Sequence, residues 1–202
     1  PRRGAPARGG TEVRPVKTAK DKHVVMGSDF AGHALKEAVK HHLIERGWTV
    51  EDLTPVKDEC PMYHRVGFAV GAKIAEKEFE KALIFCGSGM GIHVAASKVP
   101  GVHAAVCESV DSARRSTTAN NCNVMAMGAF FTGPRLAMAM ADAFLDHHFG
   151  QGYEDWDGFD AYHQLGYDEC NAFDYEAYKA NGFQVVDPGE APLGPQPKGL
   201  SF

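Results

Sequence analysis

The sequence predicts an α/β fold in which helices cover both faces of a five-stranded, mostly parallel sheet. Two observations support this prediction: five short apolar runs recur along residues 22–150, and helix-like segments alternate with them. Parallel neighbours need long crossover connections, and the helical segments supply them. Functional loops are then expected at the carboxyl ends of the strands.

The first strand is predicted at residues 23–27, "HVVMG", and a helix follows it. That helix ends at Gly47, and its apolar residues recur every four positions, as a buried helix face requires; they are Leu35, Val39 and Leu43. The second strand is "WTVEDL". The next helix shows the same spacing in Val66, Val70 and Ile74.

The alternation continues to about Gly150. "ALIFC", residues 82–86, is too short for a helix and is predicted as a buried strand. After it come a helix, a strand, a helix, a strand and a last helix, in the order "GIHVAASK", "HAAVC", "SVDSARRSTTA", "NVMAMG" and "PRLAMAMADAFLDHHF".

Composition divides the chain into four parts. Residues 1–21 are rich in Pro, Gly and Arg and are predicted to form a flexible basic arm, before the main domain at 22–150. Residues 151–186 combine aromatic residues with carboxylates, which suggests an appendage packed on the domain or on a partner subunit. Residues 187–202 are proline-rich and are predicted to form an extended tail.

The composition also limits the partners and the chemistry. The net charge of −5 gives no general attraction to nucleic acid or to an acidic membrane, and no apolar run is long enough to span a bilayer. A signal sequence is not evident, so we expect a cytoplasmic protein. The five cysteines are scattered without a CxxC pair, so we expect reduced thiols and no metal site.

A cysteine stands at the start of a glycine-rich loop. Cys86 ends the third strand, and the next residues turn the chain into a helix; they are Gly87, Ser88, Gly89, Met90 and Gly91. Glycines permit close backbone approach and positive φ, and loop amides can hold an anionic oxygen. A cysteine here can transfer a proton once its thiol is deprotonated. The alternative is that Cys86 is a small buried residue that ends the strand.

The loop does not fit two common motifs. "GSGMGI" lacks the third glycine of the dinucleotide fingerprint, and no GK[ST] follows, so nucleotide binding is a weak alternative and no cofactor is expected. Ser88 does not lie in a GxSxG elbow, which argues against a serine triad.

Three ordered segments resemble the ribose-5-phosphate isomerase B and galactose-6-phosphate isomerase family: "GSDFAGHALKEAVKHHLIERGWTVEDL", "FCGSGMGIHVAASKVPGVHAAVC" and "NNCNVMAMGAFFTGPRLA". The resemblance covers roughly residues 21–149. It implies a Rossmann-like three-layer α/β/α sandwich, a homodimer or larger assembly with sites between subunits, and metal-independent isomerisation of a sugar between aldose and ketose.

The resemblance also assigns roles to residues. It implies that Cys86 shuttles the proton and that Ser88, in the place of a threonine, binds substrate oxygens. The loop amides would stabilise a cis-enediolate; this loop contains Gly87, Gly89 and Gly91. Asp29 and Asn120 match residues that contact the sugar, although Asp29 could instead serve as a turn or helix cap. Arg114 could reach a ligand or lie exposed on its helix.

The departures from the family fall at substrate positions. Phe30 stands where the family has a ring-opening histidine, and Ala119 replaces a second histidine. Cys60 and Phe130 stand where a tyrosine and an arginine are expected, and "QGYEDWDGF" replaces a segment rich in phosphate-binding arginines. Four other histidines could take over ring opening or could be unrelated to the site: His33, His64, His93 and His103.

We therefore expect an aldose–ketose isomerase whose substrate is not a standard pentose 5-phosphate; a sugar, a sugar acid or an unphosphorylated ketose would fit. The alternative is a catalytically silent homologue that binds carbohydrate or has a regulatory role.

Overall fold

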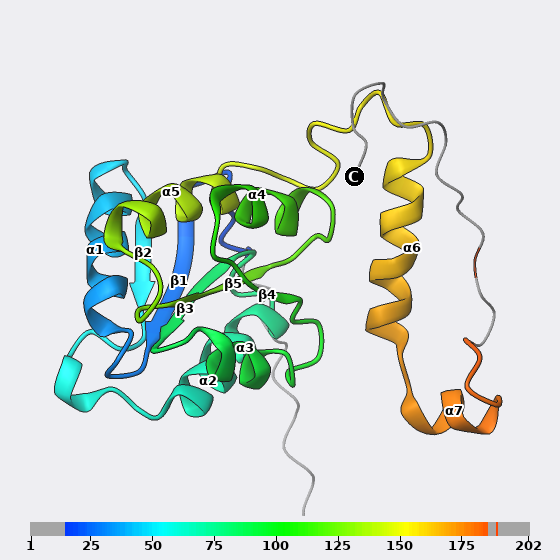
Figure 1. The fold of residues 1–202 in the computed structure, drawn as a ribbon, viewed down its shortest axis with the longest axis horizontal. Coiled ribbons are helices and arrows are strands. Elements are labelled where there is room, and N and C mark those ends of the chain that lie inside the picture. The colour runs from blue at the N-terminus through cyan, green and yellow to red at the C-terminus, as the bar shows by residue number, and fades with distance from the viewer. Residues whose placement is uncertain (1–14, 186–188, 190–202) are drawn as a thin grey trace, which may run out of the picture.

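The fold is built on one sheet of five parallel strands, in the order β2-β1-β3-β5-β4 (Figure 1). The computed structural model describes residues 15–185 and Gly189. The strands are β1 (His23–Ser28), β2 (Thr49–Asp52), β3 (Ala82–Cys86), β4 (Ala104–Val106) and β5 (Val124–Gly128). The predicted fold class is confirmed, and the strand that ends at Cys86 is the central one.

Helices cover both faces of the sheet, as predicted. α1 (His33–Glu45), α4 (Val110–Thr118) and α5 (Pro134–Leu145) lie on one face, and α2 (Tyr63–Ala75) and α3 (Met90–Ala96) lie on the other (Figure 1). A short 3-10 helix, η1 (Lys57–Glu59), precedes α2. The predicted apolar stripes of α1 and α2 are buried.

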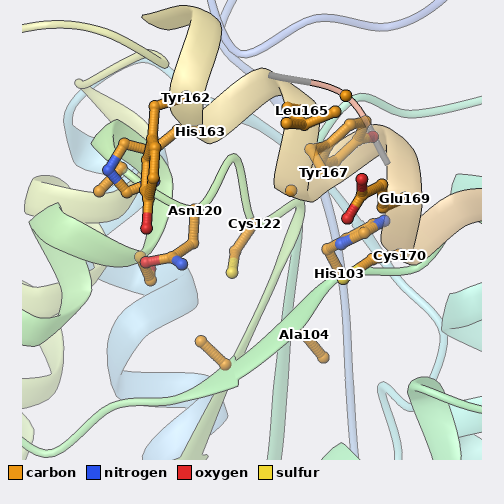
Figure 2. Close-up of a pocket in the computed structure, with 15 residues that line it drawn as sticks. His103, Ala104, Asn120, Cys122, Tyr162, His163, Leu165, Tyr167, Glu169 and Cys170 are labelled. Carbon is orange, nitrogen blue, oxygen red and sulfur yellow. The ribbon is translucent and has the colours of Figure 1, made fainter. Parts of the chain in front are cut away.

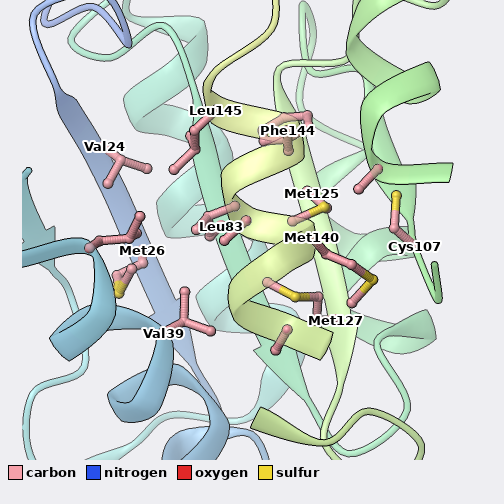
Figure 3. Close-up of a cluster of buried hydrophobic side chains, with 14 of the residues drawn as sticks. Val24, Met26, Val39, Leu83, Cys107, Met125, Met127, Met140, Phe144 and Leu145 are labelled. Atoms are coloured by element: carbon pink, nitrogen blue, oxygen red, sulfur yellow. The ribbon is translucent and has the colours of Figure 1, made fainter. Parts of the chain in front are cut away.

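The two faces form two separate cores because successive side chains of a strand point to opposite sides. Leu83 and Phe85 of β3 pack with α1 and α5, together with Met125 and Phe144 (Figure 3). Cys86 faces the other way, with Ala82 and Ile84, into the core under α2 and α3. Every side chain of β3 is buried, which explains the uninterrupted apolar run in the sequence.

Residues 15–21 depart from the predicted flexible arm, because they pack on the domain. Lys17 forms a parallel bridge with Phe79, and its ammonium group lies 3.0 Å from the Glu51 carboxylate. The rest of the predicted arm, residues 1–14, lies outside the described residues. So does the predicted tail at 187–202, apart from Gly189.

Residues 151–185 contain two helices that the sequence pattern did not predict, α6 (Phe159–Ala172) and α7 (Tyr175–Ala180). α6 stands beside the domain in Figure 1. Its start is anchored by Trp156 and Phe159, which form a small buried cluster with Ala119; the Tyr153 ring stacks on Phe159 at 3.8 Å. No helix in the described part of the chain is long and apolar enough to cross a membrane.

Candidate functional site

The thiol of Cys86 lies at the carboxyl end of the central strand, with 4% of the residue exposed. The backbone N–H of Gly89 donates a hydrogen bond to its sulfur across 3.1 Å. Gly89 has a φ of 76°, in the left-handed region that residues with a side chain rarely adopt. The glycine therefore lets the loop fold back so that an amide points at the thiol.

The turn that carries Asp29 lies against the same end of β3. The Asp29 N–H donates to the Phe85 carbonyl at 3.1 Å, and one carboxylate oxygen accepts the Gly32 N–H at 2.9 Å. A Cβ at Gly32 would lie 2.5 Å from the Phe85 carbonyl carbon and 2.7 Å from the Cys86 nitrogen. Asp29 thus closes its own turn, as the capping alternative expected, and this turn contacts the Phe85–Cys86 peptide.

A buried polar network supports the Asp29 turn from behind. The Ser28 N–H donates to the Thr54 hydroxyl at 2.8 Å, and the Lys36 ammonium group donates to the Thr54 carbonyl at 2.5 Å. The same ammonium group lies 2.7 Å from the Asp52 carboxylate, which Lys40 also contacts at 2.7 Å. Burial is the largest single influence on the pKa of Asp52 and favours a higher value, but the hydrogen bonds from Lys36, Lys40 and the Thr54 N–H, together with the charge of Lys36, lower that pKa.

Two aromatic rings cover the glycine loop, and a third aromatic residue, Phe30, follows β1 at the same edge of the sheet. The Phe130 ring covers Gly87, because a Cβ there would lie 2.4 Å from a ring carbon. The Tyr63 ring covers Gly91 in the same way, with a ring carbon 2.7 Å from a Cβ placed there. Phe30 is 56% exposed, and the Lys57 ammonium group lies 4.5 Å from the centre of its ring.

Ser88 forms the outer part of the loop. Its hydroxyl accepts the Met90 N–H at 3.3 Å, and the residue is half-buried. A Cβ at Gly128 would lie 2.5 Å from the carbonyl carbon of Ser88, so the end of β5 supports the loop through close backbone contact. The structure thus gathers seven of the predicted site residues at one edge: Asp29, Phe30, Cys86, Gly87, Ser88, Gly89 and Gly91.

Asn120 and Arg114 lie elsewhere in the chain. Asn120 precedes β5, at the amino ends of the strands, and lines a cavity of about 950 Å³ beside α6. Figure 2 shows it there with Tyr162 and His163 of α6. Arg114 is exposed on α4 and lies 2.7 Å from the Asp111 carboxylate, as the exposed alternative expected.

The four histidines considered for ring opening occupy different places. His33 is buried in the first turn of α1, with its ring 3.4 Å from the Pro55 carbonyl. The rings of His64 and His93 contact Phe68 and the Ala104 carbonyl, respectively. His103 lies at the amino end of β4 and stacks on Tyr167 at 4.2 Å. Among the described residues no cluster of three His, Cys, Asp or Glu could hold a metal ion.

Comparison with known proteins agrees with this architecture. The sequence profile of the family described as Ribose/Galactose Isomerase matches residues 24–156. The chain belongs to the ribose/galactose isomerase family. The match spans the sheet, the Cys86 loop and the start of the appendage.

Relatives in the family carry several isomerase names. A 4-deoxy-4-sulfo-D-erythrose isomerase of Clostridium sp. (strain MSTE9) is 36% identical over 66% of this chain and 84% of that protein. The ribose-5-phosphate isomerase B of Escherichia coli (strain K12) is 34% identical over 65% of this chain and 88% of its own. The Clostridium thermocellum ribose-5-phosphate isomerase B structure matches with a TM-score of 0.66 at 30% identity, covering 79% of this chain and 99% of that one.

Two residues that contribute to this edge in the isomerase fold were missed by the sequence analysis. Gly32 was not singled out, although it follows the Asp29 turn directly, where a helix begins. Tyr63 was not singled out either, because its ring reaches Gly91 only through the packing of α2 against α3. For Gly32 the signal was a glycine three residues after Asp29, at the start of a predicted helix.

Proposed function

We propose that the protein is an aldose–ketose isomerase that transfers a proton between C1 and C2 of an open-chain sugar. Family membership supports sugar isomerisation. The position of Cys86 carries the proposal: its thiol ends the central strand, at the sheet edge where α/β proteins bind ligands. A loop amide points at the sulfur, and the Asp29 turn contacts the adjoining peptide.

In the proposed reaction the Cys86 thiolate removes the proton from C2 of the open-chain aldose. The electrons of the C–H bond form the C1=C2 double bond, and the carbonyl electrons move onto O1, which gives a cis-enediolate. The thiol then returns its proton to C1, while a proton passes from O2 to O1. No atom is gained or lost, and the loop amides stabilise the negative charge while it is present.

The substrate we propose is not a standard pentose 5-phosphate. Phe130 lies beside the thiol loop where the family resemblance calls for an arginine, and a dianionic phosphate needs cationic partners. The segment after α5 presents exposed carboxylates at Glu154, Asp155 and Asp157. Two relatives carry names that refer to other substrates, 4-deoxy-4-sulfo-D-erythrose and D-erythrulose 4-phosphate.

The proposed active unit is a homodimer. Val124 pairs with Ala82, and Gly128 pairs with Cys86, so Asn120 and Cys86 lie beyond opposite ends of neighbouring strands. The length of a five-residue strand, roughly 16 Å, separates these ends. A second subunit would let Asn120 of one chain reach the thiol of the other, as the family resemblance implies.

Hydrogen exchange tests the proposal. The protein is incubated in deuterated water with a panel of aldoses and ketoses, both free and phosphorylated, and deuterium at C1 or C2 is followed by NMR. Incorporation with at least one sugar, together with its isomer as product, is the expected result. Failure with every member of a broad panel would reject the isomerase.

A carbohydrate-binding homologue without activity is the second candidate. It is favoured by one observation: Phe30 and Ala119 occupy the positions of two expected histidines. Such a protein would release measurable heat on binding a sugar whose carbon-bound protons never exchange. The two candidates are thus separated by calorimetry and NMR on the same samples.

A further inference from the structure

Two exposed phenylalanines follow the two strands that border β3. Phe30 follows β1 by two residues, and Phe130 follows β5 by two residues. β1 and β5 are the two neighbours of β3, which ends at Cys86. Both rings are largely open to solvent, with 56% of Phe30 and 73% of Phe130 exposed. The Phe30 ring contacts the Lys57 ammonium group, whereas the Phe130 ring lies against the thiol loop itself.

Backbone hydrogen bonds fix the Phe130 segment beside the loop. The Ala129 N–H donates to the Cys86 carbonyl at 2.9 Å, and the Phe130 N–H donates to the Gly87 carbonyl at 2.8 Å. The ring then lies over Gly87, where three of its carbons would be 2.4, 2.6 and 3.1 Å from an added Cβ. Gly87 does not lie in the left-handed region, so its role here is to leave room for this ring.

We infer that Phe130 is a specificity-determining residue that selects an unphosphorylated sugar by contact with its C–H-bearing faces. This inference rests on the proposed isomerase function. Contact between an exposed aromatic ring and another apolar surface is favourable because it removes both from water, and the C–H faces of a sugar provide such a surface. A phosphate dianion against the Phe130 ring would lose hydration without gaining a charged hydrogen-bond partner from that ring.

The contact between Gly87 and Phe130 gives a way to move the ring without touching it. In Gly87→Ala the new methyl group meets the far end of a flexible, exposed side chain, which can turn away without disturbing either core. The fold should remain intact while the ring leaves its position. This variant should therefore weaken sugar binding in the same direction as Phe130→Leu.

The experiment compares Phe130→Leu, Gly87→Ala and Phe130→Arg with wild type, and uses Phe131→Leu as the matched control. Phe131 is the adjacent phenylalanine and is 63% exposed. Each protein is tested by calorimetry and by exchange in deuterated water on matched pairs: D-erythrose with D-erythrose 4-phosphate, and D-ribose with D-ribose 5-phosphate. KM and kcat are measured separately, because loss of a stacking surface should act on KM.

Phe130→Leu and Gly87→Ala should raise the KM or Kd for the free sugar roughly 3- to 10-fold, and in Phe130→Leu the change in kcat should be much smaller than the change in KM. Phe130→Arg should shift the preference toward the phosphorylated partner roughly 10- to 100-fold. Phe131→Leu should match wild type. Circular dichroism and thermal melts establish that each variant is folded.

The possible failures point to different conclusions. If wild type isomerises a sugar but the Phe130 variants leave the ratio of free to phosphorylated affinity unchanged, the specificity inference fails and the isomerase stands. If a sugar binds without exchange, and Phe130→Leu weakens that binding, the isomerase fails and the recognition surface stands. If no sugar binds or exchanges, both are rejected.

Discussion

The backbone N–H of Gly89 points at the sulfur of Cys86 across 3.1 Å, so one loop holds both the proposed proton-transfer group and a hydrogen-bond donor directed at it. The contact closes a short turn within three residues of sequence. A donor in this position interacts more favourably with a thiolate than with a thiol. This geometry fits the proposed role, in which the sulfur carries negative charge for part of the reaction.

Replacing the thiol tests its chemical role. Cys86→Ser is nearly isosteric, but a hydroxyl is far harder to ionise near neutral pH. Turnover should fall by roughly 100-fold or more, with much less change in KM. Cys107→Ser is the control, because that buried thiol lies away from the loop and its pKa is raised by burial; turnover should stay near wild type. A fully active Cys86→Ser enzyme would remove the proposed proton-transfer role.

Gly32→Ala tests the contact between the Asp29 turn and β3. The added methyl group would meet the backbone of Phe85 and Cys86, which cannot move aside as a side chain can. We expect a loss of about 2 kcal/mol or more in the free energy of unfolding, measured by urea denaturation, and reduced turnover. Gly133→Ala is the control, because nothing lies within 4 Å of a Cβ there. Equal stability of the two variants would contradict the proposed backbone contact.

The ion pairs of Asp52 predict how the stability of the fold depends on pH. Burial favours a higher pKa for Asp52, but hydrogen bonds from Lys36 and Lys40 lower it below the value in the unfolded chain. The stabilisation is therefore present above the unfolded pKa, near 4, and is lost as the pH falls through the lower pKa of the folded state. The free energy of unfolding of wild type should fall steeply below about pH 4.

Asp52→Asn should reduce the dependence of the free energy of unfolding on pH below about pH 4. At pH 7 it should lower the free energy of unfolding by about 3 kcal/mol, because the fully buried Lys36 loses its closest carboxylate. The control is Asp111→Asn, which breaks an exposed pair with Arg114 and should cost less than about 1 kcal/mol. Urea denaturation from pH 3 to pH 7 measures both. An unchanged acid slope in Asp52→Asn would assign the acid sensitivity to other carboxylates.

A mixture of two inactive variants tests the proposed dimer. If Cys86 of one subunit acts with Asn120 of the other, a mixed dimer of Cys86→Ser and Asn120→Ala subunits contains one intact site and one doubly altered site. Co-expression should restore about a quarter of the wild-type activity, since half of the dimers are mixed and each has one working site. Light scattering should give twice the chain mass. A monomer mass, or no recovery in verified mixed dimers, would reject a shared site.

The sequence predicted the sheet well because parallel strands buried on both faces appear as uninterrupted apolar runs. "ALIFC" is the clearest case, since every residue of β3 is buried. α6 was missed for the opposite reason: within it Phe159 alone is buried, so no apolar stripe marks the helix. α7 contains no buried residue and was missed in the same way.

The site was predicted in part. Residues that directly follow a strand, such as Asp29 and the Cys86 loop, could be placed at one edge from the order of elements. The position of Asn120 could have been found in the same way, because it precedes the predicted strand "NVMAMG" and so belongs to the amino edge. The contact between the Phe130 ring and Gly87 could not have been predicted, since it depends on how the chain continues after two neighbouring strands.

The two phenylalanines that follow β1 and β5 belong to neither buried core, since both lie in exposed loops beyond the strand ends. Exchanging such residues changes what meets the substrate while the stability of the sheet is little affected. In this scaffold the residues that hold the fold and the residue proposed to choose the sugar are thus physically separate. A lineage could acquire a new substrate by a few loop substitutions, without a period of impaired folding and without altering the sulfur chemistry at the centre.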